Sequence, residues 1–260
     1  MDAKFLPLKS VRNPRDLGGY VGADGRKIKD GLLLRTGTVS CITPEDAAFL
    51  QRYGVKTIID LRSPAECLNR PDAAIEGIKD LHIPVSSRDR TKAGASLREL
   101  AELYKADPLA GFKHMLGTYQ RMVTAEHSQK AFHRILTFLA EAEGGTIFHC
   151  SEGKDRTGMT AVLLLYLLGV DEETIRQDYL ASGPALNDYR KKRDEEARAN
   201  GESLIQRANL RSLGTVNNEY LDSALVAIEQ NYGGMERFLA EEIAVTPDLR
   251  RKLQEKYLEK

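Results

Sequence analysis

The sequence predicts an α/β fold, in which helices flank a central sheet of about four to five mostly parallel strands and form a lid-like insertion. Two observations favour this class. Short apolar runs rich in β-branched residues alternate with helical patterns along the 260 residues. Such continuous hydrophobicity is typical of strands covered on both faces, as in parallel sheets. Recognisable helix-capping sequences lie between these runs.

The strands are expected to be short and to end at one edge of the sheet. In folds of this kind, the functional site lies where the C-terminal ends of the parallel strands meet. Asp60 ends the second strand and is therefore a candidate functional residue. The strands are expected at 32–37 (LLLRTG), 56–61 (KTIIDL), 80–85 (DLHIPV) and 145–150 (GTIFHC).

Two helices are expected to begin at 43–46 (TPED) and 63–66 (SPAE). In each, Thr or Ser as N-cap precedes Pro at the first helical position, and an acid follows two residues later. The second sequence gives Glu66 a structural explanation, because its carboxylate can cap Ser63 in return. We prefer this explanation to a functional role for Glu66.

Further helices are indicated by the spacing of apolar residues. The segment 157–170 (TGMTAVLLLYLLGV) is apolar on nearly all sides, which predicts a buried helix. An i, i+3, i+4, i+7 stripe should pack on the sheet as core. It consists of Phe132, Ile135, Leu136 and Leu139.

Residues 184–215 differ from the rest of the chain, because they are polar and dense in charge. We expect a surface excursion that could form a mobile helical lid over a site. The basic run from Arg190 to Arg193 could meet a phosphate-rich substrate. The acids that follow it at 194–196 favour a solvated helix face instead.

Composition excludes several classes of partner. The 38 basic and 38 acidic side chains cancel, so no global charge favours nucleic acid or an acidic membrane. The three cysteines Cys41, Cys67 and Cys150 are an odd number without a CxxC pair, which argues against a disulfide framework or zinc.

No targeting or membrane segment is evident in the sequence. The N-terminus has no apolar core of a signal peptide, and the longest apolar run, 161–168, is too short to span a bilayer. We therefore expect one soluble, cytoplasmic domain over 1–260, with its insertion at about 184–215. Export without a classical signal peptide stays open.

The segment HCSEGKDRTG (149–158) is predicted to bind an anion, because it joins the last strand to a helix that begins near Thr157. Backbone N–H groups of such a loop surround a concave site, and the helix N-terminus points into it. Arg156 adds a planar fork of donors for two phosphoryl oxygens. Gly153 and Gly158 allow unusual backbone angles and close approach of a ligand. The phosphate-binding residues are expected to be Ser151, Glu152, Gly153, Lys154, Asp155 and Arg156.

The same loop should activate Cys150. A helix N-terminus and nearby cations can lower a thiol pKa by several units, which would make Cys150 a thiolate at neutral pH. Its attack on phosphorus would give a cysteinyl-phosphate that water hydrolyses. Thr157 could donate to the sulfur, and His149 is expected to order the loop, because a thiolate needs no base. No metal or cofactor is expected, because the loop and Arg156 supply the positive charge.

Cleavage of a phosphate monoester also needs a proton for the leaving oxygen. Asp155, at the rim of the loop, is the nearest candidate, and Asp60 is its rival. Asp155 could instead be an ion-pair partner of Arg156 or Lys154. Asp107 and Asp89 are weaker candidates.

The loop matches the CxxxxxR signature of the protein tyrosine phosphatase superfamily, and its lysine resembles that of phosphoinositide phosphatases. Over nearly its whole length the chain is similar to the atypical bacterial protein tyrosine phosphatases. The resemblance implies a single protein tyrosine phosphatase-like α/β domain with helical insertions over the site and without a mobile WPD acid loop. It is carried further by NPRDLGGY (13–20), LLLRTGTVS (32–40), IIDLRSPAE (58–66) and YGGMERFL (232–239).

The resemblance also implies roles for particular residues. It gives the acid role to the loop aspartate, here Asp155, and places the turn of Asn13 and Asp16 against the loop. Asp16 could equally shape that turn. Arg62 is expected to anchor the loop by ion pairs. Glu152 departs from the family, where a small residue is more usual, and it would repel a dianion unless it is paired, for example with Lys154.

The other two cysteines, Cys41 and Cys67, are expected to be small buried hydrophobes. Either could form a protective disulfide with Cys150 under oxidation.

We therefore predict a cysteine-dependent, metal-independent phosphate-monoester hydrolase acting on phosphotyrosine proteins. Activity on phosphoserine, phosphothreonine and phosphoinositides is implied by the resemblance. The alternatives are a phosphoinositide phosphatase, a sulfurtransferase and a non-catalytic phosphate-binding module. The expected partner is a phosphoprotein or a phosphoinositide, and nucleic acid is not expected.

Overall fold

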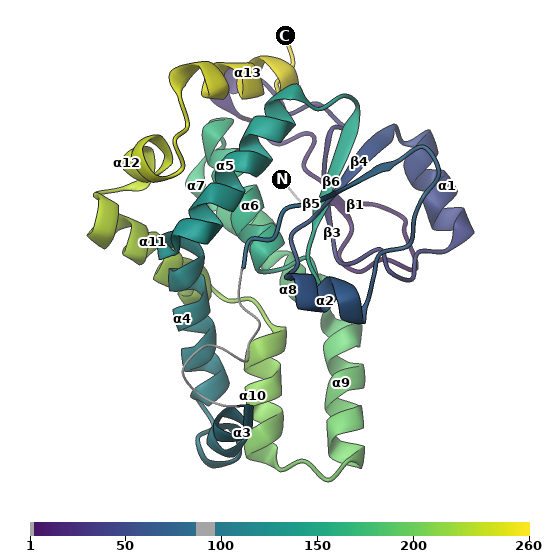
Figure 1. Cartoon of the computed structure of the whole chain (residues 1–260), viewed down its shortest axis with the longest axis vertical. Helices are drawn as coiled ribbons and strands as arrows, with labels where there is room; N and C mark the ends of the chain where they lie inside the picture. The colour runs from purple at the N-terminus through teal and green to yellow at the C-terminus, as the bar shows by residue number, and fades with distance from the viewer. Residues whose placement is uncertain (1–2, 87–96) are drawn as a thin grey trace.

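The computed structural model describes residues 3–86 and 97–260, and within them the chain forms a mixed sheet flanked by helices (Figure 1). The described sheet has six strands in the order β1-β2-β3-β6-β4-β5. The four strands from β3 to β5 in this order run parallel, whereas β1 and β2 are antiparallel. The strands are β1 Lys4–Phe5, β2 Arg15–Asp16, β3 Leu33–Thr36, β4 Val55–Asp60, β5 Lys79–His82 and β6 Gly145–His149.

The α/β class and all four expected strands are confirmed. The expected strands correspond to β3, β4, β5 and β6, which form the parallel part of the sheet. The sheet is larger than expected because β1 and β2 extend its antiparallel edge. Each of these two strands has two residues, too few to give a hydrophobic pattern.

The sheet buries apolar side chains on both faces. On β6, Phe148 packs into the larger core, whereas its neighbour Ile147 belongs to the smaller one. Successive side chains of a strand point to opposite faces, so this alternation requires helices on both sides. Figure 1 shows α5, α6 and α7 on one side and α1 on the other. Leu50 of α1 lies in the smaller core.

The helices include those expected from the capping sequences. Thr43 caps α1, and Ser63 and Glu66 form a capping box at α2. The expected stripe lies buried in α5. The described helices are α1 Pro44–Arg52, α2 Pro64–Asn69, α3 Leu97–Ala106, α4 Ala110–Thr124, α5 Glu126–Glu141, α6 Arg156–Leu167, α7 Glu172–Leu180, α8 Ser182–Ala185, α9 Asn187–Ala199, α10 Leu204–Gly214, α11 Asn218–Tyr232, α12 Met235–Arg237 and α13 Pro247–Tyr257, with a 3₁₀ turn at Ala23–Gly25 and a π-helical turn at Phe238–Glu242.

The charge-dense excursion is helical. It forms α9 and α10, which lie below the sheet in Figure 1, with α3 and α4 beside α10. Asp194 of α9 links the two helices, because its carboxylate lies 2.6 Å from Arg207 and 3.1 Å from Arg211 of α10. None of the helices in the described ranges has the length and hydrophobicity needed to cross a membrane.

Candidate active site

The cysteine loop lies between the C-terminal end of β6 and the N-terminus of α6. Cys150 follows the last strand residue directly, and α6 begins at Arg156. The side chain of Cys150 is buried. Burial by itself raises the pKa of the Cys150 thiol, but the positive charge of Arg156 and hydrogen bonding from Thr157 outweigh it. The pKa of Cys150 therefore lies below its ordinary value, which favours a thiolate.

Three carbonyl groups of the loop are held from outside it. The Cys150 carbonyl accepts from His149 Nδ1 (3.2 Å), and the Ser151 carbonyl accepts from the Thr38 backbone N–H (3.3 Å). The Gly153 carbonyl accepts from Asn13 Nδ2 (2.8 Å) and from a terminal nitrogen of Arg35 (3.0 Å). In a trans peptide the C=O and the following N–H point in opposite directions. The N–H groups that follow these carbonyls are therefore directed toward the inside of the loop.

Gly153 is needed at its position in this loop. Its φ is +70°, and a Cβ atom would lie 2.4 Å from the carbonyl carbon and oxygen of Thr36. Gly158 is different, because its backbone does not adopt a positive φ. A Cβ atom there would lie 3.2 Å from the ring of Tyr179, so its small size serves close packing. The expectation of an unusual backbone angle was therefore right for Gly153 and wrong for Gly158.

Arg156 is fixed by a carboxylate from a distant helix. Its two terminal nitrogens donate to Glu66 Oε2 (2.7 Å) and Oε1 (2.8 Å), and Ser151 Oγ also donates to Oε1 (2.6 Å). Burial would raise the pKa of Glu66, but the hydrogen bonds and charge of Arg156 hold it far below its ordinary value. Burial would also lower the pKa of Arg156, and Glu66 and the Cys150 thiolate raise it instead.

Glu66 therefore has two roles. It caps Ser63 as expected, with its Oε2 accepting from the Ser63 backbone N–H at 3.0 Å. The same oxygen also accepts from Arg156, so the expected cap is confirmed and is joined by a contact with the cysteine loop that the sequence did not predict. The sequence carries no signal of this pairing, because the two residues are 90 positions apart.

The loop lysine contacts both the loop and the excursion. Lys154 is buried, and its Nζ donates to Asp155 Oδ2 (2.7 Å) and to the carbonyl of Leu213 at the end of α10 (2.8 Å). Glu152 lies 3.9 Å from Lys154 Nζ and 3.7 Å from Arg193 of α9. The Glu152 carboxylate is thus paired with two cations, and Lys154 is the one that the sequence suggested.

The two acid candidates have different surroundings. Asp155 accepts from Tyr119 through Oδ1 (2.8 Å) and from Lys154 through Oδ2, and its side chain is 22% exposed. Asp60 accepts from the backbone and side chain of Arg62 and, through Oδ2, from Cys67 Sγ (3.2 Å). Both candidates thus have both carboxylate oxygens hydrogen-bonded, but only Asp155 belongs to the cysteine loop. Asp107 pairs with Lys113 on the surface, and Asp89 lies outside the described residues.

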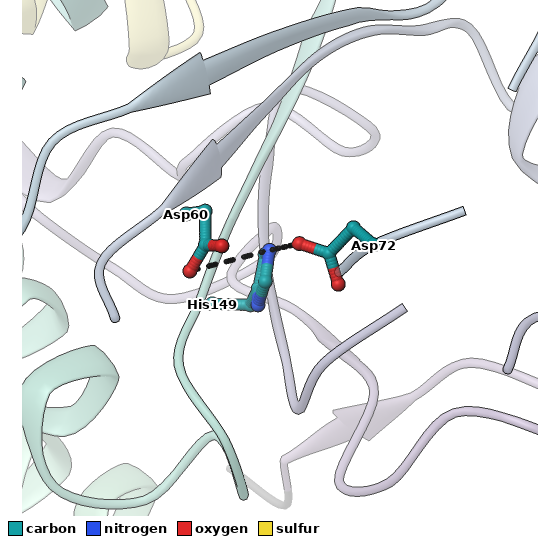
Figure 2. A group of neighbouring side chains, drawn as sticks. All are labelled: Asp60, Asp72 and His149. Atoms are coloured by element: carbon teal, nitrogen blue, oxygen red, sulfur yellow. Dashed lines mark ion pairs between the residues drawn. The ribbon is translucent and has the colours of Figure 1, made fainter. Parts of the chain in front are cut away.

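A second cluster surrounds the buried His149 (Figure 2). His149 Nε2 lies 3.0 Å from Asp72 and 4.0 Å from Asp60, while Arg62 donates to Asp60 (2.7 Å) and to Asp72 (2.8 Å). Burial lowers the pKa of His149, but the hydrogen bond and charge of Asp72 outweigh it and raise this pKa. Burial raises the pKa of Asp72, and His149 lowers it more strongly.

The ligand atoms of Asp60, Asp72 and His149 lie within 4.8 Å of one another, a spacing that could suit a metal ion. However, the Arg62 guanidinium already donates to both carboxylates, and the raised pKa of His149 favours its cationic form beside them. We therefore interpret the cluster as an ion-pair network that fixes the end of β6.

The N-terminal turn contacts the loop through Asn13. Beneath the loop, Arg15 and Arg35 are fully buried around one carboxylate, Asp178, at 3.4 Å and 2.5 Å. Asp16 does not take part. Its carboxylate instead accepts from the backbone of Gly18 (2.9 Å) and Gly31 (2.8 Å), which is the turn-shaping alternative.

Among the described residues, sequence reasoning missed several partners of this site, and tertiary folding brings each of them to it. They are Arg35, Asp72, Tyr119, Asp178 and the pairing of Glu66 with Arg156.

The other cysteines differ from the expectation. All three thiols are free, and Cys41 is exposed rather than buried. Cys67 is partly buried, and burial together with the hydrogen bond and charge of Asp60 raises its pKa to about 12. Neither is the small buried hydrophobe that the sequence suggested.

The chain thus combines an α/β sheet with a buried cysteine in the loop that follows a parallel strand. Over residues 6–259 it matches the tyrosine phosphatase family. The chain belongs to this family, which confirms the resemblance found in its sequence motifs. By class it is a protein-tyrosine phosphatase.

Three relatives illustrate the membership. A protein of Cupriavidus necator, provisionally named a tyrosine-protein phosphatase, is 30% identical over 243 residues, covering 92% of this chain and 84% of the relative. The triple specificity protein phosphatase PtpB of Mycobacterium tuberculosis is 28% identical over 259 residues, covering 89% and 91%. A tyrosine-protein phosphatase of Nostoc commune is 29% identical over 209 residues, covering 79% and 67%.

Proposed function

We propose that this protein hydrolyses phosphotyrosine in proteins through a cysteinyl-phosphate at Cys150. The observation that carries the proposal is the buried thiol of lowered pKa at the N-terminus of α6, beside Arg156. A thiolate in a loop of inward N–H groups is suited to attack a bound phosphate dianion.

Substrate binding would use the loop and Arg156. The inward N–H groups that follow the held carbonyls can each donate to a phosphoryl oxygen. Arg156 uses one hydrogen of each terminal nitrogen for Glu66, and a guanidinium has five N–H donors. Donors therefore remain for the phosphate, and Glu66 holds their plane fixed before substrate arrives.

In the first step, the Cys150 thiolate forms a bond to phosphorus while the bond from phosphorus to the tyrosine oxygen breaks. Asp155 gives its proton to that leaving oxygen, so a neutral tyrosine departs. In the second step, water attacks the cysteinyl-phosphate and passes a proton to Asp155 as the sulfur leaves as a thiolate. Thr157 would stabilise the departing sulfur, since its buried hydroxyl has no other partner among the described residues.

The test is the variant Cys150→Ser, assayed on an aryl phosphate and a phosphotyrosine peptide. Turnover should fall by at least about 10³-fold, because a serine hydroxyl is not ionised at neutral pH. Vanadate binding should persist, because the loop N–H groups remain. Cys67→Ser serves as the control and should keep its turnover. Retained turnover in Cys150→Ser would refute the proposal.

A phosphoinositide is the second candidate substrate. A cavity of about 410 Å³ between α9 and α10 is lined in part by Arg190, Lys191 and Arg211. Such a basic cavity could receive a further phosphate of a multiply phosphorylated headgroup. Rates on a phosphotyrosine peptide and on soluble phosphoinositides, compared in one preparation, decide between the two. Sulfur transfer would instead leave a persulfide on Cys150 that mass spectrometry detects.

A further inference from the structure

Two buried tyrosines reach the acid candidate from beneath the loop. The hydroxyl of Tyr179, on α7, donates to the hydroxyl of Tyr119, on α4, at 2.9 Å. Tyr119 in turn donates to Asp155 Oδ1 at 2.8 Å. Both tyrosine side chains have 0% exposure. The two hydrogen bonds thus connect the protein interior to Oδ1 of Asp155.

The position of Tyr119 is fixed by its neighbours. Its ring packs edge-on against Tyr179, with centroids 6.1 Å apart, and lies 5.9 Å from the ring of Tyr220. Gly158 of α6 leaves the space that the Tyr179 ring fills. Because packed aromatic rings have few alternative rotamers, the Tyr119 side chain is already fixed with its hydroxyl pointing to Asp155.

Tyr119 acts as a donor at every working pH. Its burial and the charge of Asp155 raise its pKa well above the ordinary value. A Tyr119 hydroxyl that cannot ionise must place its proton toward an acceptor, and Asp155 Oδ1 is the acceptor it has. The direction of this hydrogen bond is therefore settled.

The two oxygens of Asp155 consequently differ. Oδ1 faces a fully buried hydroxyl, whereas Oδ2 faces the ammonium of Lys154. Oδ1 is thus turned to the protein interior, and Oδ2 is the oxygen on the side of the loop lysine.

We propose that Tyr119, supported by Tyr179, is a positioning residue that presents Oδ2 of Asp155 to the leaving oxygen. The inference rests on the proposed function, in which Asp155 supplies the proton. It assigns a kinetic role to a residue of α4, outside the motifs that resemble the phosphatases.

The test compares Tyr119→Phe with the unaltered enzyme on aryl phosphates whose leaving phenols differ in pKa. Phenylalanine keeps the ring and removes only the hydroxyl. We expect kcat on the poorest leaving groups to fall about 10-fold, with little change on the best, because only poor leaving groups need the proton. Vanadate affinity should not change.

Tyr257→Phe is the matched control. Tyr257 is also fully buried, and its hydroxyl donates to the Leu139 carbonyl at 2.7 Å, away from the loop. Tyr257→Phe should lose a comparable amount of stability, but any change in its kcat should not depend on the pKa of the leaving phenol. Tyr179→Phe should shift the same kinetic quantities as Tyr119→Phe by a smaller factor, and it replaces Tyr119→Phe as the test should that variant not fold.

A double variant completes the test. If Tyr119 acts through Asp155, adding Tyr119→Phe to Asp155→Asn should cost no further activity on poor leaving groups. Additive losses, a uniform fall across leaving groups or unchanged kinetics would each overturn the inference. These outcomes are distinct from failure of the proposed function, which would appear as turnover without Cys150.

Discussion

Glu66 and Arg156 form a two-point ion pair across 90 residues of sequence, with N···O distances of 2.7 and 2.8 Å. The same carboxylate closes the capping box of α2. Helix α2 and Arg156 are thus positioned by one side chain, so we expect a change at Glu66 to affect both stability and catalysis. Two variants separate these effects.

Glu66→Gln should mainly impair oxyanion binding. Glutamine can still close a capping box, but it removes the charge that faces Arg156. We expect vanadate affinity to fall about 10-fold while the free energy of unfolding changes by less than about 1 kcal/mol. Ser63→Ala is the counterpart, since it removes the cap and keeps the carboxylate. It should lower stability by about 1 kcal/mol and leave vanadate affinity nearly intact. The same response in both variants would contradict the division of roles.

Alkylation of Cys150 by iodoacetamide should follow a titration whose midpoint lies below that of an ordinary thiol. The rate depends on the thiolate, and Arg156 and Thr157 lower the pKa of Cys150 against its burial. Arg156→Gln should move the midpoint to higher pH. The measurement belongs in a Cys41→Ser background, because Cys41 is exposed, whereas the raised pKa of Cys67 keeps that thiol protonated. An unshifted midpoint would remove the basis for a thiolate nucleophile.

Gly153→Ala should abolish phosphatase turnover. The added Cβ would meet the Thr36 carbonyl at 2.4 Å, so the loop must move and lose its inward N–H groups. Gly25→Ala is the matched control, because Gly25 has a similar φ of +74° and open space around its Cβ position. Backbone strain should cost each variant about 1 kcal/mol in thermal or urea unfolding. Only Gly153→Ala should lose activity, and normal turnover in it would show that the loop tolerates the displacement.

The ion pair of His149 with Asp72 should make stability depend on pH. The pKa of His149 is raised in the folded protein, so its contribution is fully present below the unfolded pKa of about 6.5. That contribution is lost as pH rises through the folded pKa. The free energy of unfolding of the wild type, measured in urea, should therefore decrease above about pH 6.5. His149→Gln should lack this decrease. The same pH dependence in both proteins would place its origin elsewhere.

Local patterns were sufficient for much of the fold. The parallel strands and the caps at Thr43 and Ser63 were predictable because each is encoded within a few neighbouring residues. The edge strands β1 and β2 were not, since strands of two residues are defined by their pairing partners and not by their own pattern.

The candidate site, like the fold, could be predicted from the sequence only in part. The loop from Cys150 to Arg156 is contiguous, and spacing alone indicated its chemistry. The groups that orient the loop come from elsewhere. Asp72 reaches His149 from an irregular segment after α2, and Asp178 meets Arg35 from the last turn of α7. Such partners are chosen by tertiary contact, and a single sequence gives no periodicity from which to infer them.

The outward carbonyls of the cysteine loop have their donors on separate parts of the chain. One comes from the turn before β2, two from β3 and the residues after it, and one from β6. A partly folded chain that lacks any of these parts cannot hold the cysteine loop in its folded form. During refolding, phosphatase activity should therefore return only when the sheet is complete. It should appear later than the helical signal, so turnover would report when the tertiary structure is complete.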